Sequence, residues 1–312
     1  MGNNAINTNH VVGQQPDLGI TNRGSDWYYT VAAIMGISTI TIMALAFRKP
    51  QSHRIFHYIT AAVTAIATIA YFAMGSNLGQ VPIRPEFIRK YDPQVRPAGT
   101  REIFYARYID WAFTTPLLLL DLLLTAGVPW PTIAATIFAD EIMIACGLIG
   151  ALTQTRYKWG FYAFGLAALF FIAYELLIDG RRHASALGGD AKKTYYTCGI
   201  FLIFLWFLYP IAWGLSEGGN VIHPDSESIF YGILDVLSKP VFGALLIWGH
   251  RRTDPRSLGM RIRQTHQFRE KYPNADQNGV QPEGPGSNVG GHGNPGVAGA
   301  GDPNAPSHGV NV

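Results

Sequence analysis

Seven apolar stretches, most of them about 20 residues long, dominate this sequence. A helix needs about 20 residues to cross the hydrocarbon core of a bilayer. The composition agrees, because 48% of the residues are hydrophobic and only 14% are charged, whereas roughly a quarter are charged in soluble domains. The sequence therefore predicts an all-α membrane protein with seven transmembrane helices at approximately 27–47, 55–75, 103–125, 131–152, 159–178, 195–216 and 227–249.

Basic residues between the stretches predict the orientation. Lys and Arg favour the cytoplasmic side, and they gather in the first and fifth connections and after residue 250, whereas the sixth connection is acidic. Because the number of spans is odd, the amino terminus is expected outside and the carboxyl terminus in the cytoplasm. The expected parts are an extracellular segment 1–26, a seven-helix domain 27–250 and a cytoplasmic tail 251–312.

Two further segments bear on this division. The tail becomes rich in Gly, Pro and Asn from about Pro273 and is expected to be largely disordered. The second connection, residues 76–102, contains five basic residues although it should lie outside. Its alternating apolar and polar residues predict a hairpin over the outer mouth of the bundle. Residues 1–25 lack an apolar core, so no cleavable signal peptide is expected.

The seventh stretch carries two opposite charges four residues apart, Asp235 and Lys239. That spacing places both side chains on one face of a helix. An ionisable residue at membrane depth is costly and indicates a functional site with a nearby partner. Pro240 follows at once and should loosen the helix there. The residues alone leave two interpretations open: a structural ion pair between helices, or an amine that forms a Schiff base with a carbonyl cofactor.

The third stretch carries acids at two depths. Arg107 and Asp110 lie near its start, and Asp121 is eleven residues beyond Asp110, about 16 Å along the same helix face. Asp121 is flanked by leucines without a cation, so we expect it to be protonated, whereas Asp110 should be ionised. Two carboxyls in different protonation states on one line can pass a proton.

Three motifs, in the third, sixth and seventh stretches, together resemble a known family. They read ARYIDW-x-x-TTPLLLLD, W-x-x-YP-x-x-W and LDVLSK. The chain resembles the microbial rhodopsins, the seven-helix retinal proteins to which bacteriorhodopsin belongs, over roughly residues 27–250. The arginine-rich second connection and the HPDSE before the seventh stretch are most similar to the fungal branch.

The resemblance implies a function and its partners. It implies a light-driven outward proton pump with all-trans retinal bound covalently to Lys239. The alternative is a sensory photoreceptor of the same fold with a slow photocycle. Besides retinal and the lipid bilayer, the resemblance implies a homo-oligomer, a trimer, in the plasma membrane, and neither an enzyme nor a metal site. The small net charge of +3 gives no reason to expect nucleic-acid binding.

The resemblance also assigns roles to the charged residues. Lys239 would hold retinal as a protonated Schiff base, Asp110 would be its counterion and first proton acceptor, and Asp235 a second counterion. Asp121 would be the cytoplasmic donor and Arg107 a gate. Glu217 and Glu227 match the two outer glutamates of the proton-release group in bacteriorhodopsin, the alternative being two solvated acids at loop ends. Asp140 matches the aspartate near the retinal ring.

The retinal pocket implied by the resemblance draws on the third, fourth, sixth and seventh stretches. The aromatic residues of the sixth share one helix face, although core packing is the alternative for any such set. Tyr162 and Gly165 stand where bacteriorhodopsin has a tryptophan and a serine, and Ser238 replaces an alanine, for which we expect a modest blue shift. The implied pocket residues are Trp111, Thr114, Thr115, Leu118, Met143, Gly147, Trp206, Tyr209, Pro210, Trp213, Ser238 and Lys239 itself.

Other functions fit the sequence less well. A sensory photoreceptor typically lacks a carboxyl donor, and a chloride pump needs a neutral residue at the counterion position, whereas Asp121 and Asp110 are both present. An opsin-like protein without pigment would lack Lys239. A seven-helix receptor for a G protein gives no reason for two acids on one line. Composition alone does not separate a pump from a slow sensor.

Overall fold

The computed structural model describes residues 3–10, 15–87 and 99–259. The chain divides into two compact units, Met1–Gln264 and Thr265–Val312. The predicted disordered tail falls outside the described residues, as does part of the second connection. All elements discussed below belong to the first unit.

The described part of the chain contains seven helical spans that are each long and apolar enough to cross a membrane. The first four are α2 (Asn22–Phe47), α3 (Ile55–Gly75), α4 (Tyr105–Ala126) and α5 (Trp130–Leu152). The fifth joins α6 (Lys158–Tyr174), η2 (Glu175–Asp179) and α7 (Gly180–Leu187), and the sixth joins α8 (Gly189–Trp213) and η3 (Gly214–Gly218). The seventh joins α9 (Pro224–Val236), η4 (Leu237–Val241) and α10 (Phe242–Gly249). The predicted fold class, a seven-helix membrane protein, is confirmed.

The predicted spans differ from the structure mainly in the fifth and sixth helices. These helices continue as Lys158–Leu187 and Gly189–Gly218, 30 residues each, so the polar connection between them is almost wholly helical. Gly188 and Gly189 turn the chain there with φ values of +70° and +54°. Glycine adopts this left-handed region without steric cost, which explains a reversal in so short a connection.

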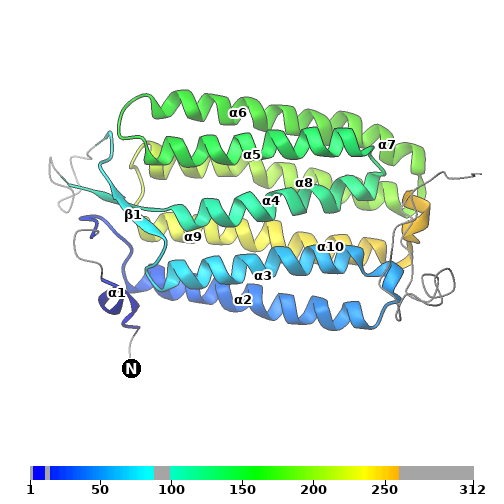
Figure 1. Ribbon diagram of the computed structural model, residues 1–312, viewed down its shortest axis with the longest axis horizontal. Helices are drawn as coiled ribbons and strands as arrows, with labels where there is room; N and C mark the ends of the chain where they lie inside the picture. The colour runs from blue at the N-terminus through cyan, green and yellow to red at the C-terminus, as the bar shows by residue number, and fades with distance from the viewer. Residues whose placement is uncertain (1–2, 11–14, 88–98, 260–312) are drawn as a thin grey trace, which may run out of the picture. The chain divides into compact units, whose positions relative to one another are not determined.

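The second connection forms a hairpin, as predicted. Strands β1 (Gln80–Ile83) and β2 (Arg101–Phe104) are antiparallel, with Gln80 opposite Phe104 and Ile83 opposite Arg101. The amino-terminal segment joins them, because the Leu18 amide donates to Thr100 O and the Glu102 amide donates to Leu18 O, each at 2.9 Å. We call this end of the bundle the hairpin end and the opposite end, where α10 finishes, the tail end (Figure 1).

Helix α4 has the largest buried share of the seven spans. It packs against α3 and α5 on either side (Figure 1) and also contacts α8. The helix ends at Ala126, and the following Gly127 has a φ of +65°, which allows the Val128 amide to reach Leu123 O. Its charged residues therefore face neighbouring helices rather than lipid. The remaining short elements are α1 (Ala5–Thr8), η1 (Gln51–His53), η5 (His250–Arg252) and η6 (Pro255–Leu258).

Five-residue π-helical segments occur in each of the last three described spans: η2 and η4 interrupt the fifth and the seventh, and η3 ends the sixth. Such segments are rare and frequently mark functional sites. Pro240 lies in η4 directly after Lys239, and proline lacks the N–H that an α-helix would use. The predicted loosening of the helix at Pro240 is confirmed. Of the two cysteines, Cys198 is buried and Cys146 is only half-buried, and both are free thiols.

Candidate functional site

Lys239 is the centre of a buried group of charges. Its side chain is 1% exposed. The amine donates one hydrogen bond to Asp235 Oδ2 at 2.9 Å and another to Asp110 Oδ2. The pair at i and i+4 is thus formed, and α4 brings a second carboxylate from 129 residues away in the sequence.

The two carboxyls beside Lys239 have unequal surroundings. Asp235 Oδ1 accepts from the Tyr209 hydroxyl at 2.5 Å, and Asp235 Oδ2 accepts from Tyr71 at 2.9 Å as well as from the amine. Three donors thus occupy both oxygens of Asp235. Asp110 Oδ1, in contrast, has no partner among the described residues. Asp110 is therefore the carboxyl with an oxygen open to a proton.

An apolar cavity leads away from the Lys239 amine between α4, α5, α6 and α8. Aromatic rings form much of its wall: Trp111 meets Tyr209 edge-on at 5.2 Å, and Tyr162 stacks on Trp213 at 5.1 Å. The predicted residues that line it are Trp111, Thr115, Leu118, Met143, Gly147, Trp206, Tyr209, Pro210, Trp213, Ser238 and Lys239.

The residues that line the cavity differ in part from the predicted pocket residues. Thr114 is buried beside Asp110, and its hydroxyl donates to the Asp110 carbonyl at 2.8 Å, so it belongs to the helix turn rather than to the cavity wall that the described residues form. The substituted positions Tyr162 and Gly165 do line the cavity. The wall also contains residues that sequence reasoning missed, namely Tyr108, Ile144, Phe161, Leu166 and Tyr231.

Asp140 lies on α5 with its side chain against the cavity wall. Its Oδ2 is 2.6 Å from the Thr115 hydroxyl oxygen, which is also 2.8 Å from Trp111 O. A hydroxyl has one proton and can donate to only one of these two acceptors. Both contacts are hydrogen bonds if Asp140 is itself protonated and donates to Thr115. The buried acid then needs no counter-charge.

Asp121 has the same arrangement toward the tail end. It is fully buried, and the Thr60 hydroxyl oxygen lies 2.9 Å from Asp121 Oδ2 and 2.7 Å from Phe56 O. The single Thr60 hydroxyl proton can be donated to only one of these two oxygens. If Asp121 is protonated, its own proton makes the second hydrogen bond, from Asp121 to Thr60. Leu118 and Leu122 beside it are buried as well. The geometry suits the expected neutral acid, whose protonation stays a prediction.

Arg107 lies on α4 one turn before Asp110, toward the hairpin end. Its guanidinium donates to Glu227 Oε1 at 2.7 Å, to Glu217 Oε1 at 3.1 Å and to the Tyr28 hydroxyl at 2.9 Å. The guanidinium carbon also lies 4.2 Å from the centre of the Tyr231 ring. Arg107 therefore connects two acids on different helices.

Glu217 and Glu227 are only 3% and 2% exposed, so the alternative of two solvated loop acids is wrong. Three hydroxyls surround Glu217: Tyr108 and Tyr231 donate to it, each at 3.1 Å, and Ser216 contacts its Oε2. The π-helical turn η3 carries the Glu217 carboxyl into the bundle. Glu217 and Glu227 of the sixth connection therefore belong to the interior, whereas the Asp225 side chain between them is 20% exposed.

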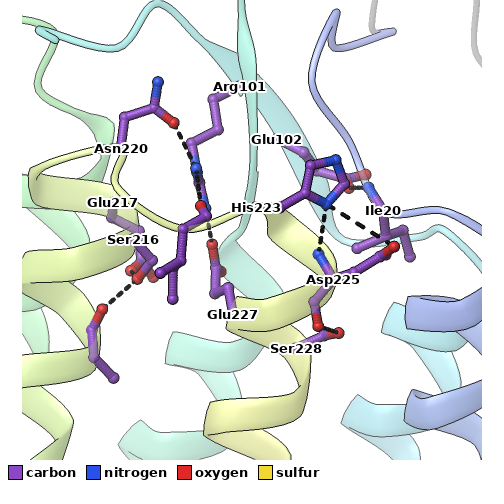
Figure 2. Close-up of polar contacts among 12 residues, drawn as sticks. Ile20, Arg101, Glu102, Ser216, Glu217, Asn220, His223, Asp225, Glu227 and Ser228 are labelled. Atoms are coloured by element: carbon purple, nitrogen blue, oxygen red, sulfur yellow. Dashed lines mark hydrogen bonds and ion pairs between the residues drawn. The ribbon is translucent and has the colours of Figure 1, made fainter. Parts of the chain in front are cut away.

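Arg101 of β2 is a second guanidinium at these acids, shown in Figure 2. Its Nη2 lies 2.6 Å from Glu227 Oε2, and its Nη1 donates to Asn220 Oδ1 at 2.5 Å and to Ile222 O at 2.8 Å. Sequence reasoning counted Arg101 only as a loop charge that violated the orientation rule. Its side chain is in fact buried and ion-paired.

Glu102, the neighbour of Arg101, holds the amino-terminal segment. It accepts a hydrogen bond from the Ile20 amide at 2.7 Å and is 2% exposed (Figure 2). Burial, only partly opposed by that hydrogen bond, raises the pKa of this carboxyl to about 7. The sequence does not mark this acid, because nothing in the loop pattern separates it from a solvated glutamate.

The comparisons with known proteins agree with this geometry. Residues 23–252 match the family model described as bacteriorhodopsin-like protein. The chain is 58% identical to the opsin-like protein carO of Fusarium fujikuroi over 264 residues, 84% of this chain and 85% of that protein.

Two solved structures are similar in fold and sequence. One is the light-driven proton pump LR (Mac) from Leptosphaeria maculans, 37% identical with a TM-score of 0.71 over 75% of this chain and 98% of that one. The other is the light-driven proton pump Coccomyxa subellipsoidea rhodopsin, 37% identical with a TM-score of 0.70 over 75% and 99%. With its seven spans and its buried lysine, this chain belongs to the bacteriorhodopsin-like family of microbial rhodopsins, with fungal opsins among its relatives.

Proposed function

We propose that this protein is a light-driven outward proton pump that carries all-trans retinal as a protonated Schiff base on Lys239. One observation carries the proposal: a lysine held by two carboxyls at the mouth of an apolar cavity, with a third buried carboxyl on the same helix as the first. Two similar solved structures are those of light-driven proton pumps.

The residues present fit retinal. The cavity is walled by aromatic and aliphatic side chains, which suit a polyene, and it reaches the Lys239 amine, which can form the covalent link. Its polar features are few, and Asp140 and Thr115 satisfy each other at the wall. Bound there, retinal would supply the light-driven change of shape that moves the charge on the Lys239 nitrogen relative to Asp110.

Asp110 is the proposed proton acceptor. Its Oδ2 faces the Lys239 nitrogen and its Oδ1 is unpartnered within the described residues. Asp235 is the weaker candidate, because Tyr71, Tyr209 and Lys239 already donate hydrogen bonds to its two oxygens. In this proposal Asp235 remains the permanent negative charge beside the lysine.

Asp121 is the proposed donor on the cytoplasmic side. It lies eleven residues beyond Asp110 on α4, about 16 Å along the helix, and its buried leucine surroundings keep a proton on it until water enters. A neutral donor at rest and an ionised acceptor give the transfer a direction. The tail end would accordingly be cytoplasmic and the hairpin end external.

The proposed exit passes Arg107 and the two buried glutamates. Arg107 stands between the Asp110 level of α4 and both acids, so its movement can change how strongly each carboxyl holds a proton. We propose that Glu217 and Glu227 pass the proton to the hairpin end. The segment 1–26 would lie outside, the tail 251–312 inside, and the protein would reside in the plasma membrane as a trimer.

Illumination of cells that express the chain and are supplied with retinal tests the proposal. The suspension should become more acidic in the light, a protonophore should abolish the change, and Lys239→Ala should be colourless and silent. A coloured protein that gives no acidification would favour the slow sensory photoreceptor. Colour retained in Lys239→Ala would remove the covalent assignment.

A further inference from the structure

A second cavity, of about 660 Å³, lies at the tail end between α2, α3 and α10. Leu45 of α2 and Ala244 and Trp248 of α10 form part of its wall. These side chains are exposed although they belong to membrane-spanning helices, and Trp248 is 66% exposed. The groove is therefore open toward lipid along its apolar length.

Three cations surround the tail end of this groove: Arg48 and Lys49 after α2, and Arg251 after α10. None of the three pairs with a carboxylate in the part of the chain that the structure describes. The Arg251 guanidinium lies 4.0 Å from the centre of the Trp248 ring. Nearby Asp254 is exposed and accepts from the Arg256 amide. The end of the groove thus has an uncompensated positive charge.

Buried polar atoms without partners line the groove beside these cations. His57 is 6% exposed, and its Nδ1 has no hydrogen-bond partner among the described residues. His250 Nε2 and Thr253 Oγ1 are likewise buried atoms without a hydrogen-bond partner among the described residues. Nearly all buried polar groups in folded proteins are hydrogen-bonded, so three such atoms in one cavity indicate a ligand that bonds to them.

The hydrogen bonding of His250 restricts which chemical groups the ligand can present to it. Its Nδ1 is 2.8 Å from Leu246 O and must donate there, which leaves Nε2 as an acceptor in the neutral ring. Burial, opposed by that hydrogen bond and reinforced by nearby His57, lowers the pKa of His250 to about 4. The ring is therefore neutral at neutral pH, and the ligand must offer a donor such as a hydroxyl.

We infer that this groove binds an anionic glycerophospholipid whose headgroup carries hydroxyl groups, as phosphatidylinositol does. The phosphate faces Arg48, Lys49 and Arg251, a headgroup hydroxyl donates to His250 Nε2, and an acyl chain lies along Leu45 and Trp248. A basic pocket between transmembrane helices is suited to such headgroups. The inference stands whether or not the protein pumps protons.

The chain itself is a poor alternative occupant. The residues that follow Gly259, MRIRQTHQFREK, are basic and would repel the three cations. Their apolar residues are also few and scattered. An anionic amphiphile satisfies the charge, the unpartnered atoms and the open apolar wall together.

Native mass spectrometry of the full-length protein from mixed micelles tests the inference. We expect a single phosphatidylinositol to be retained, with phosphatidylcholine lost under the same conditions. The triple variant Arg48→Gln, Lys49→Gln, Arg251→Gln should bind it roughly a hundredfold more weakly, since each cation near a membrane surface contributes about one kcal/mol. Ala244→Phe should block retention without changing charge. Soluble glycerophosphoinositol, which lacks acyl chains, should not be retained.

Matched controls separate the groove from general membrane charge. The triple variant Arg181→Gln, Arg182→Gln, Lys192→Gln removes the same charge near the other tail-end helices, and Ala167→Phe enlarges an exposed α6 residue. Both should retain the lipid as the parent does. Equal retention in the groove variants and their controls, or equal retention of phosphatidylcholine, would overturn the inference. The inference would also be overturned if the parent formed a dimer instead of retaining lipid and if Ala244→Phe abolished that dimer.

Discussion

Arg101 Nη2 lies 2.6 Å from Glu227 Oε2, and both side chains are 2% exposed. Together with Arg107 this gives two guanidinium groups for the two buried carboxyls Glu217 and Glu227. With the charges matched in this way, the acids have no need to share a proton at rest. We therefore expect proton release at the hairpin end to follow proton uptake in the parent protein.

Arg101→Gln should reverse that order. With one guanidinium for two acids, a proton should bind between Glu217 and Glu227 at rest and leave early after a flash. A pH-indicator dye measures the order of release and uptake. Breaking the buried pair should also lower the free energy of unfolding by about 3 kcal/mol. Arg23→Gln, at an exposed residue of α2, is the control and should change neither quantity. Late release in Arg101→Gln would contradict the charge count.

Asp110→Asn tests the acceptor. The Lys239 nitrogen would keep Asp235 but lose one of its two carboxylates, so less negative charge would hold its positive charge. We expect absorption to shift to the red and light-induced acidification to disappear. Asp140→Asn removes a buried acid that contacts Thr115 instead and should keep both properties close to the parent. Unchanged colour with full pumping in Asp110→Asn would exclude the assignment.

Asp121→Asn tests the donor. The amide can still contact Thr60 but cannot give up a proton, so the parent absorption should return roughly a hundredfold more slowly after a flash. The rate should become strongly dependent on pH, and azide or another small weak acid should restore it. Flash spectroscopy from pH 5 to 8 measures this. Recovery as fast as in the parent at neutral pH would assign the donor role to another group.

The central charges could be predicted because each follows from spacing within one helix. Asp235 and Lys239 are four residues apart, and Asp110 and Asp121 are eleven apart, so helical periodicity alone aligns each pair. Pro240 likewise acts on its own helix. The hairpin followed from local alternation in the second connection. These relationships need no knowledge of how the helices pack.

The partners of these residues could not be predicted, because they come from other elements. Two of these partners, Thr60 for Asp121 and Tyr71 for Asp235, lie on α3. Arg101, the partner of Glu227, lies on strand β2. A threonine or tyrosine in an apolar helix looks like any other. The preference of loop Lys and Arg for the cytoplasmic side applies to residues that face solvent, so it gave no sign that Arg101 is buried and ion-paired.

Glu102 makes the stability of the hairpin end depend on pH. Folding raises its pKa from the usual 4.5 to about 7, so the folded protein binds this proton more tightly than the unfolded chain. Its contribution is fully present below pH 4.5 and is lost as the pH rises through 7. The loss amounts to about 3 kcal/mol. Thermal unfolding at pH 5 and pH 8 should show this difference in the parent and a smaller one in Glu102→Gln.

The pH dependence attributed to Glu102 should be absent from the effect of an exposed carboxylate. Asp190→Asn replaces an exposed carboxylate at the start of α8 and should retain the pH dependence of the parent. If Glu102→Gln lost as much stability between pH 5 and pH 8 as the parent, the dependence would come from other groups.

The stationary photocurrent at zero membrane voltage and equal pH on both sides tests the proposed function most directly. Continuous light should drive a sustained outward current in cells that express the parent protein. Asp121→Asn should reduce that current, and azide should recover it. A current that is only transient, or one directed inward, would contradict the account of an outward proton pump.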